Sequence, residues 1–151
     1  MIKNVFLIFI FFIFVNVANA KQIRIVSDKL EILRQDNISI FSGNVYAEEN
    51  NLEIWSQKLT VLSNKDQTKI KEINAQDDVR ILKNGLSVTG NNAKYHLSNN
   101  TLIVIGQVKV MQNENIILCD EIVLDLTNSS SIVKSHSNKR VEALIISEDI
   151  N

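Results

Sequence analysis

The stretch that decides the fold is IFSGNVYAE, Ile40–Glu48, which returns as VIGQVKVMQ at Val104–Gln112 and more weakly as AQDDVRILK at Ala75–Lys83. Apolar and polar residues alternate on both sides of the centre of each phrase, as in a strand with one face turned inward. Glycine at the centre of a strand permits a kink or a close approach of two backbones. Each phrase therefore predicts a strand, a bend and a second strand. Asp77 takes the glycine position in the middle phrase, so we expect either a gentler bend there or an aspartate in an unusual backbone conformation.

A repeat extends outward from these phrases. Each phrase is followed by an alternating run that ends in a small residue, and one further run precedes the first phrase; the four small residues are Ser27, Ser56, Gly90 and Cys119. Their separations are 29, 34 and 29 residues, and the same apolar positions surround each of them, which is the signature of a repeated structural unit. In every unit the next inward position comes three residues later rather than two, as from Ser56 to Leu59. That odd step predicts a corner or bulge, where crowding favours a small side chain.

The register of the repeat predicts one inward face that is mostly aliphatic. The positions assigned to it are Ile25, Leu30, Ile32, Phe41, Val45, Leu52, Ile54, Leu59, Val61, Val79, Ile81, Leu86, Val88, Tyr95, Val104, Val108, Ile117 and Leu124. No part of the chain after residue 20 has the 3.6-residue period of an amphipathic helix. The sequence therefore predicts an all-β domain over residues 21–151.

The first twenty residues, MIKNVFLIFIFFIFVNVANA, have the pattern of a secretory signal peptide. One lysine precedes an apolar run from Val5 to Val17, and Ala18-Asn19-Ala20 forms a small-residue cleavage box. The apolar run has 13 residues, whereas a bilayer-spanning helix needs about 20, so a retained membrane anchor is the less favoured alternative. We expect cleavage after Ala20 and export of residues 21–151.

Residues suited to chemistry are few, and none of them forms a recognisable site. Residues 21–151 carry 15 basic and 17 acidic side chains, a net charge of −2, which does not indicate a nucleic-acid partner. Cys119, the single cysteine, is interpreted as a small buried residue, and His96 and His136 as solvated side chains, His136 in the polar loop SSSIVKSHSNKR. The acidic pairs at 48–49, 77–78 and 120–121 fit solvation of an outer face or turn better than the paired carboxylates of a glycosidase. We predict no catalytic residue, no metal site and no cofactor.

The phrase FSGNV at 41–45, together with the runs SDKLEI, SQKLTV and CDEIVL that end the repeats, resembles the periplasmic lipopolysaccharide-transport bridge proteins of the LptA/OstA family. SDKL at 27–30 and CDEI at 119–122 keep the family's acidic corner residue, whereas SQKL and GNNA in the middle units do not. The resemblance covers most of residues 23–146. It implies an open, twisted β-jellyroll built from repeated antiparallel strands around an apolar groove, in which the inward residues bind the acyl chains of lipopolysaccharide in the periplasm.

The resemblance also implies partners at the two ends of the sheet. The N-terminal edge around Gln22–Val26 would receive an inner-membrane-anchored transport component. The C-terminal strand RVEALII, 140–146, would receive the outer-membrane translocon or another copy of the chain, because unpaired strand edges invite strand addition. Three alternatives stay open: a membrane-anchored jellyroll paralogue of the same system, a structural β-solenoid with a dry core and no ligand, and a repetitive β enzyme that acts on glycans.

Overall fold

A computed structural model describes residues 21–148 of the 151-residue chain. The predicted signal peptide, 1–20, and its cleavage site lie outside the described residues. The described part consists of ten strands joined by turns and short loops: β1 Ile23–Val26, β2 Lys29–Leu33, β3 Ile38–Glu49, β4 Leu52–Ser63, β5 Ile70–Lys83, β6 Leu86–His96, β7 Thr101–Gln112, β8 Asn115–Asp125, β9 Ser130–Lys134 and β10 Glu142–Leu144. None of the residues from 21 to 148 belongs to a helix long and apolar enough to cross a bilayer. The all-β prediction is confirmed.

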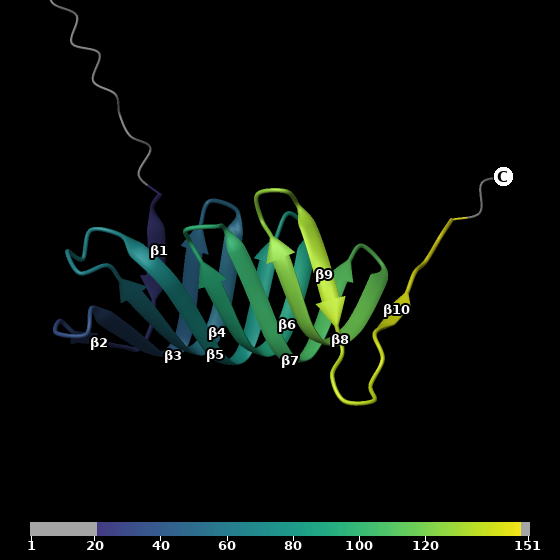
Figure 1. Cartoon of the computed structure of the whole chain (residues 1–151), viewed down its shortest axis with the longest axis horizontal. Helices are drawn as coiled ribbons and strands as arrows, with labels where there is room; N and C mark the ends of the chain where they lie inside the picture. Colours follow the sequence, from purple (N-terminus) through teal and green to yellow (C-terminus); the bar gives the residue numbers. More distant parts are fainter. Residues whose placement is uncertain (1–20, 149–151) are drawn as a thin grey trace, which may run out of the picture.

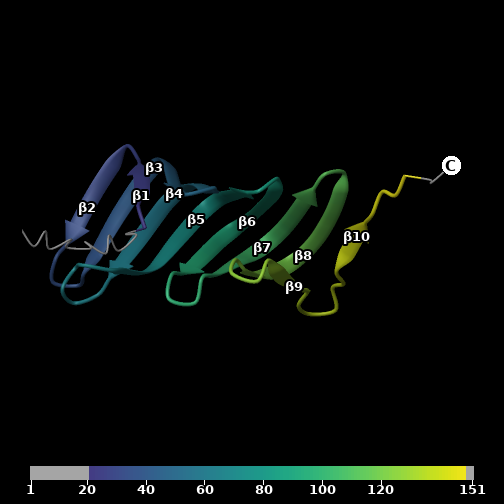
Figure 2. The same cartoon turned by 90° about the horizontal axis from the view of Figure 1, so that it is seen from above.

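All ten strands belong to one antiparallel sheet (Figures 1 and 2). Its order is β1-β3-β4-β5-β6-β7-β8-β10, with β2 beside β3 and β9 beside β8. Consecutive long strands form hairpins, and every long strand pairs with the next along the chain. The sheet therefore grows in sequence order from the N-terminal end to the C-terminal end, and its two outer edges never meet.

A line of bulges folds this sheet lengthwise. β3, β5 and β7 each carry one extra residue at the register shift, and the two residues there have positive φ: Gly43 and Asn44, Asp77 and Asp78, Gly106 and Gln107. A bulge bends its strand and increases the local twist. Asp77 has φ 64°, so the middle unit bends like its neighbours and uses an aspartate in the left-handed region, the second of the two expectations.

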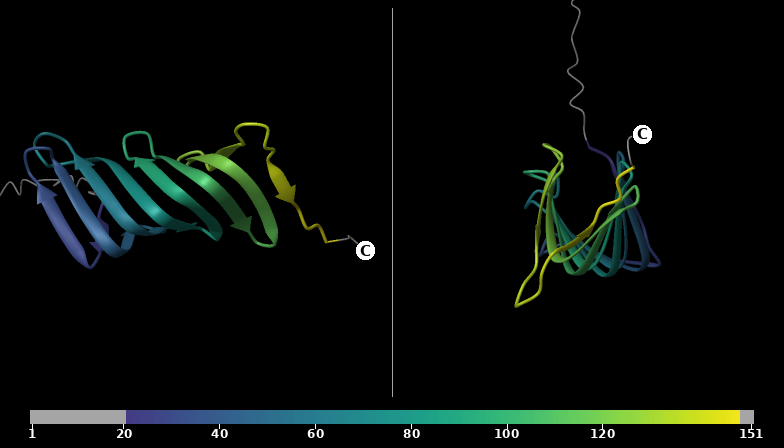
Figure 3. Two further views of the ribbon diagram at one scale, coloured as in Figure 1. Left: turned by 90° about the horizontal axis from the view of Figure 1, so that it is seen from below. Right: turned by 90° about the vertical axis from the view of Figure 1, so that its right-hand side faces the viewer.

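The bulges divide each long strand into two halves, and the halves form two facing walls of a trough that is open along its top (Figure 3, right). The first wall consists of segments 23–26, 45–49, 52–56, 79–83, 86–90, 108–112, 115–119 and 142–144. The second wall consists of segments 29–33, 38–42, 58–63, 70–76, 92–96, 101–105, 121–125 and 130–134. The floor of the trough is the line of bulges. An open, folded antiparallel sheet of this kind is the predicted jellyroll.

The predicted crowding at the corner is present. A Cβ atom on Gly90 would stand 2.6 Å from Cγ1 of Val104, and one on Gly43 would stand 2.5 Å from Oδ2 of Asp28. The backbone amide of Asp28 also donates to the carbonyl of Gly43 at 2.9 Å. Small residues at these positions let neighbouring strands approach closely across the floor.

Both ends of the sheet are made of interrupted strands. β1 and β2 pair with the two halves of β3, and β9 and β10 pair with the two halves of β8. The interpretation of 129–140 as a polar loop is wrong for Ser130–Lys134, which forms β9. The predicted C-terminal strand 140–146 is present but shorter, with pairing only over Glu142–Leu144.

Candidate functional site

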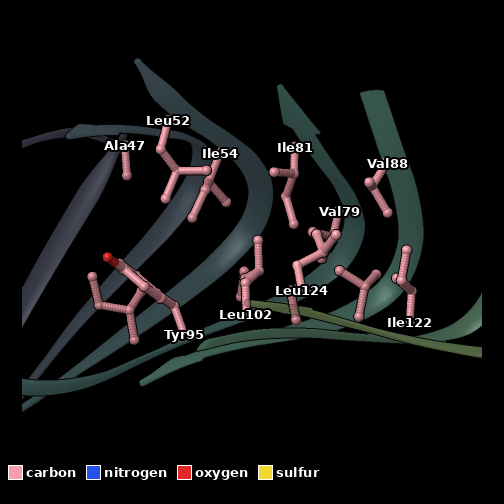
Figure 4. Close-up of a cluster of buried hydrophobic side chains, with 14 of the residues drawn as sticks. Ala47, Leu52, Ile54, Val79, Ile81, Val88, Tyr95, Leu102, Ile122 and Leu124 are labelled. Carbon is pink, nitrogen blue, oxygen red and sulfur yellow. The ribbon is translucent and has the colours of Figure 1, made fainter. Parts of the chain in front are cut away.

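The inward face assigned from the sequence lines the trough. Twelve of its eighteen residues are buried between the walls: Val45, Leu52, Ile54, Leu59, Val61, Val79, Ile81, Val88, Tyr95, Val104, Val108 and Leu124. Ile25, Phe41, Leu86 and Ile117 are partly buried and pack against them. Figure 4 shows side chains of both walls meeting in this cluster, among them Ile54 and Ile81 of the first wall and Tyr95 and Leu124 of the second. The alternation over β4–β8 was therefore assigned to the correct face.

Leu30 and Ile32 differ from the other sixteen because they are 49% and 56% exposed. Both occupy inward positions in the register of the sheet. Leu30 pairs with the inward Phe41. Ile32 pairs with Ser39, which in turn pairs with the inward Val61 on β4. They are exposed because β2 is an end strand, so no further strand continues the trough beyond it. Their exposure leaves apolar surface at the N-terminal end of the trough.

Several inward residues were missed. Ile73, Ala75, Leu102 and Val110 are buried in the same cluster. Each lies two residues from an inward neighbour on the same strand half, so the period-two pattern could have found them. The acidic pair Asp77-Asp78 obscured Ile73 and Ala75, because it interrupts the alternation that leads back from Val79.

The interior of the trough is filled by its own side chains. Leu59, Ile81 and Leu102 are among nine side chains that are less than 2% exposed. The internal space between Ile54, Ile73 and Tyr95 is only ≈ 10 Å³, whereas an open space of ≈ 940 Å³ lies at the N-terminal end. Strand pairing runs only between neighbours in the sheet order, so no backbone ladder ties one wall to the other. Apolar packing holds the walls together, and an apolar guest can replace such contacts with contacts of the same kind.

One carboxylate lies inside the trough, and the sequence interpretation of the 48–49 pair as an outer, solvated pair is wrong for it. Glu49 follows Val45 and Ala47 on the inward side of β3 and is 7% exposed. Its Oε1 lies 3.4 Å from Nζ of Lys21, and its Oε2 is buried without a hydrogen-bond partner. On the second wall, burial and the nearby Glu49 carboxylate raise the pKa of Tyr95, whose hydroxyl donates to Oδ1 of Asn100 at 2.7 Å. The alternation 45, 47, 49 was the signal that could have placed Glu49 inward.

The side chains that could take part in catalysis or metal binding are engaged in local structure. Cys119 is buried, as expected, and burial raises the pKa of its thiol. The two histidines are solvent-accessible, with side chains 33% and 56% exposed, and each also lies beside one carboxylate: Nδ1 of His96 is 3.2 Å from Glu72, and Nε2 of His136 is 3.2 Å from Glu121. Between residues 21 and 148 there is no group of three histidine, cysteine or acidic side chains placed to hold a metal ion.

Comparison with known proteins identifies relatives of this architecture. The family model described as LptA/(LptD N-terminal domain) LPS transport protein matches residues 24–130. Among solved structures, the crystal structure of LptH, the LptA homologous periplasmic component of the conserved lipopolysaccharide transport device from Pseudomonas aeruginosa, superposes with a TM-score of 0.75. The match covers 84% of this chain and 96% of that one at 15% sequence identity, which shows a shared fold. A search of curated proteins found no match.

Proposed function

Because the chain belongs to the family of LptA/(LptD N-terminal domain) LPS transport proteins, we propose that it is a periplasmic bridge protein that carries lipopolysaccharide from the inner to the outer membrane through its trough. The observation that carries the proposal is the inward apolar face, which runs from Ile23 and Ile25 of β1 through β3 to β8 and ends at Val133 of β9. A transport family also accords with the expectation that the chain is not an enzyme.

The physical argument concerns the acyl chains of the lipid. Burial of one CH₂ group is worth about 0.8 kcal/mol, so exposing an acyl chain of about twelve carbons to water costs on the order of 10 kcal/mol. A lipid with several such chains needs a continuous apolar path. The trough offers one, and its walls do not join at the top (Figure 3, right), so a polar headgroup can stay in water. Entry of the chains would separate the two walls, which are joined along the floor of bulges.

The ends of the sheet supply the proposed docking surfaces. β1 and β2 leave a free edge at the N-terminal end, and β9 and β10 leave one at the C-terminal end. We propose that the edge around Gln22–Val26 pairs with the inner-membrane-anchored component. The edge at β10 would pair with the outer-membrane translocon or a second copy of this chain. Head-to-tail pairing of unlike edges builds open filaments rather than closed rings.

Photo-crosslinking tests the lipid path. A benzophenone side chain placed at Leu30, which is inward and 49% exposed, should crosslink to lipopolysaccharide in cells. The matched control is Leu118, which is 43% exposed but lies on the outer face of β8, next to the inward Cys119. Equal labelling at both positions, or none at Leu30, would contradict transport through the trough.

The packed interior favours one competing function, a structural β-solenoid without a ligand. That function predicts that purified protein carries no lipid and that Leu30 gives no crosslink. A membrane-anchored jellyroll paralogue predicts a crosslink but an unprocessed N-terminus. Sequencing the N-terminus of the mature protein separates it from the bridge, for which we expect Lys21 as the first residue.

A further inference from the structure

The N-terminal mouth of the trough contains an open space of ≈ 940 Å³ with a mixed lining. One side is the start of the first wall, Lys21 and Ile23. The other side is the rim of the second wall, formed by the end of β4, the loop that follows it, the start of β5 and the end of β6. The space therefore lies where the two walls first face each other, directly at the entrance to the inward apolar face.

Positive charge dominates this lining. Lys21, Lys69 and Lys71 line the space, and Glu72 is the one acidic residue among its lining residues. Glu72 is already paired with Lys94 at 3.4 Å and with His96 at 3.2 Å. Within the described residues, neither Lys69 nor Lys71 has an ion-pair partner within 4.0 Å. Two ammonium groups at the mouth thus lack a carboxylate and are suited to bind an anion.

A buried acceptor beside the mouth is a second, independent feature. Glu49 is 7% exposed, its Oε1 holds Lys21, and its Oε2 has no partner. Ile23 lines both the mouth and the small space next to Glu49. A buried carboxylate oxygen without a donor carries a desolvation penalty that a hydroxyl group of a ligand would relieve. The site therefore combines cationic donors with one acceptor for a hydroxyl.

The apolar part of the lining restricts the class of ligand. Ile23, Ile70 and Leu97 line the mouth and pack against the core cluster. A free phosphate ion would leave this surface exposed to water, whereas an amphiphile would cover it and continue into the trough. The three features together match a phosphorylated sugar joined to acyl chains.

We propose that this mouth is a headgroup site, in which Lys69, Lys71 and Lys21 bind a phosphate of a phosphorylated glycolipid while Glu49 accepts a hydrogen bond from a sugar hydroxyl. The inference rests on the proposed transport of lipopolysaccharide and deepens it. It assigns the polar end of the lipid to the N-terminal mouth and to residues that the inward apolar face does not include.

The test is competitive displacement of a fluorescent acyl probe from the full exported protein at low salt. The competitors are lipid A with its phosphates and the same lipid A with the phosphates removed. The site variant is Lys69→Glu with Lys71→Glu. The control variant is Lys58→Glu with Lys109→Glu, which makes the same charge change at two lysines that do not line the mouth. Thermal melts check that both variants fold like the parent.

We expect the site variant to bind phosphorylated lipid A at least about tenfold more weakly, a change of about 1.4 kcal/mol, and to bind dephosphorylated lipid A like the parent. The control variant should bind both lipids like the parent. The headgroup site is overturned if the parent binds both lipids equally, if the two double variants behave alike, or if millimolar inorganic phosphate displaces the lipid. If neither lipid displaces the probe from the parent protein, the proposed transport function itself is contradicted, which is a different outcome.

Discussion

At the scale of single residues, two glycines with the same φ allow the energetic cost of backbone strain to be separated from the cost of a steric clash. Gly43 and Gly85 both have φ 80°, but a Cβ on Gly43 would meet Oδ2 of Asp28 at 2.5 Å, whereas nothing lies within 4 Å of a Cβ on Gly85. Left-handed backbone costs a non-glycine residue about 1–2 kcal/mol. We expect Gly85→Ala to lower the free energy of unfolding by about 1 kcal/mol and Gly43→Ala by at least about 2 kcal/mol. Urea denaturation of the two variants measures the difference, and equal losses would show that the floor is not crowded.

The pair Lys21 and Glu49 supports a second prediction at this scale. Lys21 is half exposed and Glu49 is buried, so removing the lysine leaves a buried charge without compensation. Removing one partner of a buried pair is destabilising, whereas replacing the charge by an apolar group of similar size is often neutral. We expect Lys21→Ala to cost about 1 kcal/mol of stability, reduced from the fully buried value by solvent screening. Glu49→Leu alone, or combined with Lys21→Ala, should cost less.

Urea denaturation of the processed protein, alone and in the double variant, measures these effects. Additive losses from Lys21→Ala and Glu49→Leu would contradict the pairing. Loss of lipid binding is a separate readout, because Glu49→Leu also removes the acceptor proposed for a sugar hydroxyl.

The residues also show where sequence pattern is informative and where it misleads. Alternation assigned Ile54 and Leu59 correctly because it reports the face of a strand, and a packed face tolerates few polar groups. Glu49 obeys the same alternation but was interpreted together with Glu48 as an acidic pair on an outer face or turn, which is where unpaired carboxylates are usually found. Its partner, Lys21, is 28 residues away in sequence, so no local pattern reveals the pair.

At the scale of elements, the C-terminal end of the sheet depends on one aspartate. Asp120 accepts a hydrogen bond from the backbone amide of His136 at 2.8 Å and lies 3.5 Å from Nζ of Lys139. These contacts fasten the loop that leads from β9 to β10 against the corner of β8. The loop takes the place that the bulge occupies in β3, β5 and β7, which is why β9 and β10 together resemble one interrupted strand.

The pKa of Asp120 predicts an acid-sensitive loop. The hydrogen bond from His136 lowers the pKa, and Lys139 lowers it further. A carboxyl whose folded pKa is depressed stabilises the fold above its unfolded pKa of about 3.9, and this contribution is lost as the pH falls toward the folded value. We expect the His136 amide to stay protected from hydrogen exchange above about pH 4 and to lose protection below it.

Asp120→Asn provides the matched variant for that experiment. An asparagine keeps an acceptor oxygen but has no charge, so the loop should be less protected at neutral pH and nearly insensitive to pH between about 2 and 5. The amide of Val123, within β8, serves as the internal reference because its ladder does not involve Asp120. An unchanged pH profile in Asp120→Asn would show that another group controls the loop.

Elements with a strong period were predictable, and short edge elements were not. β3 to β8 each have eleven or more residues, long enough for alternation to be visible. β9 has five residues, of which three are serine or lysine, and Val133 is its one partly buried hydrophobic residue. Pairing with β8 forms this strand, and pairing is a tertiary effect that intrinsic propensity reports poorly.

At the scale of the whole molecule, the resemblance to the LptA/OstA family predicted an open sheet, and a stack of that kind has two unpaired edges. The sequence did not predict that the trough would be filled by its own side chains. Alternation says which side chains face inward, but the distance between the walls depends on the angle at the bulges, which no residue pattern specifies. For the proposed lipid path, the packed interior means that the walls must separate, so we propose that the lipid enters at the N-terminal end, where Leu30 and Ile32 stay exposed.

The free C-terminal edge gives the last prediction. Ile146 donates its backbone amide to Oδ1 of Asn115 at 2.9 Å, so that amide points back toward β8. Backbone amides alternate in direction along a strand, which turns the amide of Ile145 toward the free edge and that of Leu144 toward β8. Proline has no amide to donate. Ile145→Pro should therefore abolish pairing with a partner strand and leave the domain intact, whereas Leu144→Pro should loosen β10 from β8.

Sedimentation over a range of protein concentrations tests this assignment. We expect the parent to form concentration-dependent oligomers, and Ile145→Pro and a chain without residues 140–151 to sediment as monomers that still bind lipid. Ile145→Ala is the matched control, because it removes a side chain that is 73% exposed but keeps the amide, and it should still oligomerise. If Ile145→Ala and Ile145→Pro lose oligomers equally, apolar contact rather than a main-chain ladder joins the subunits. If the truncated and full-length chains oligomerise alike, the contact lies elsewhere on the molecule.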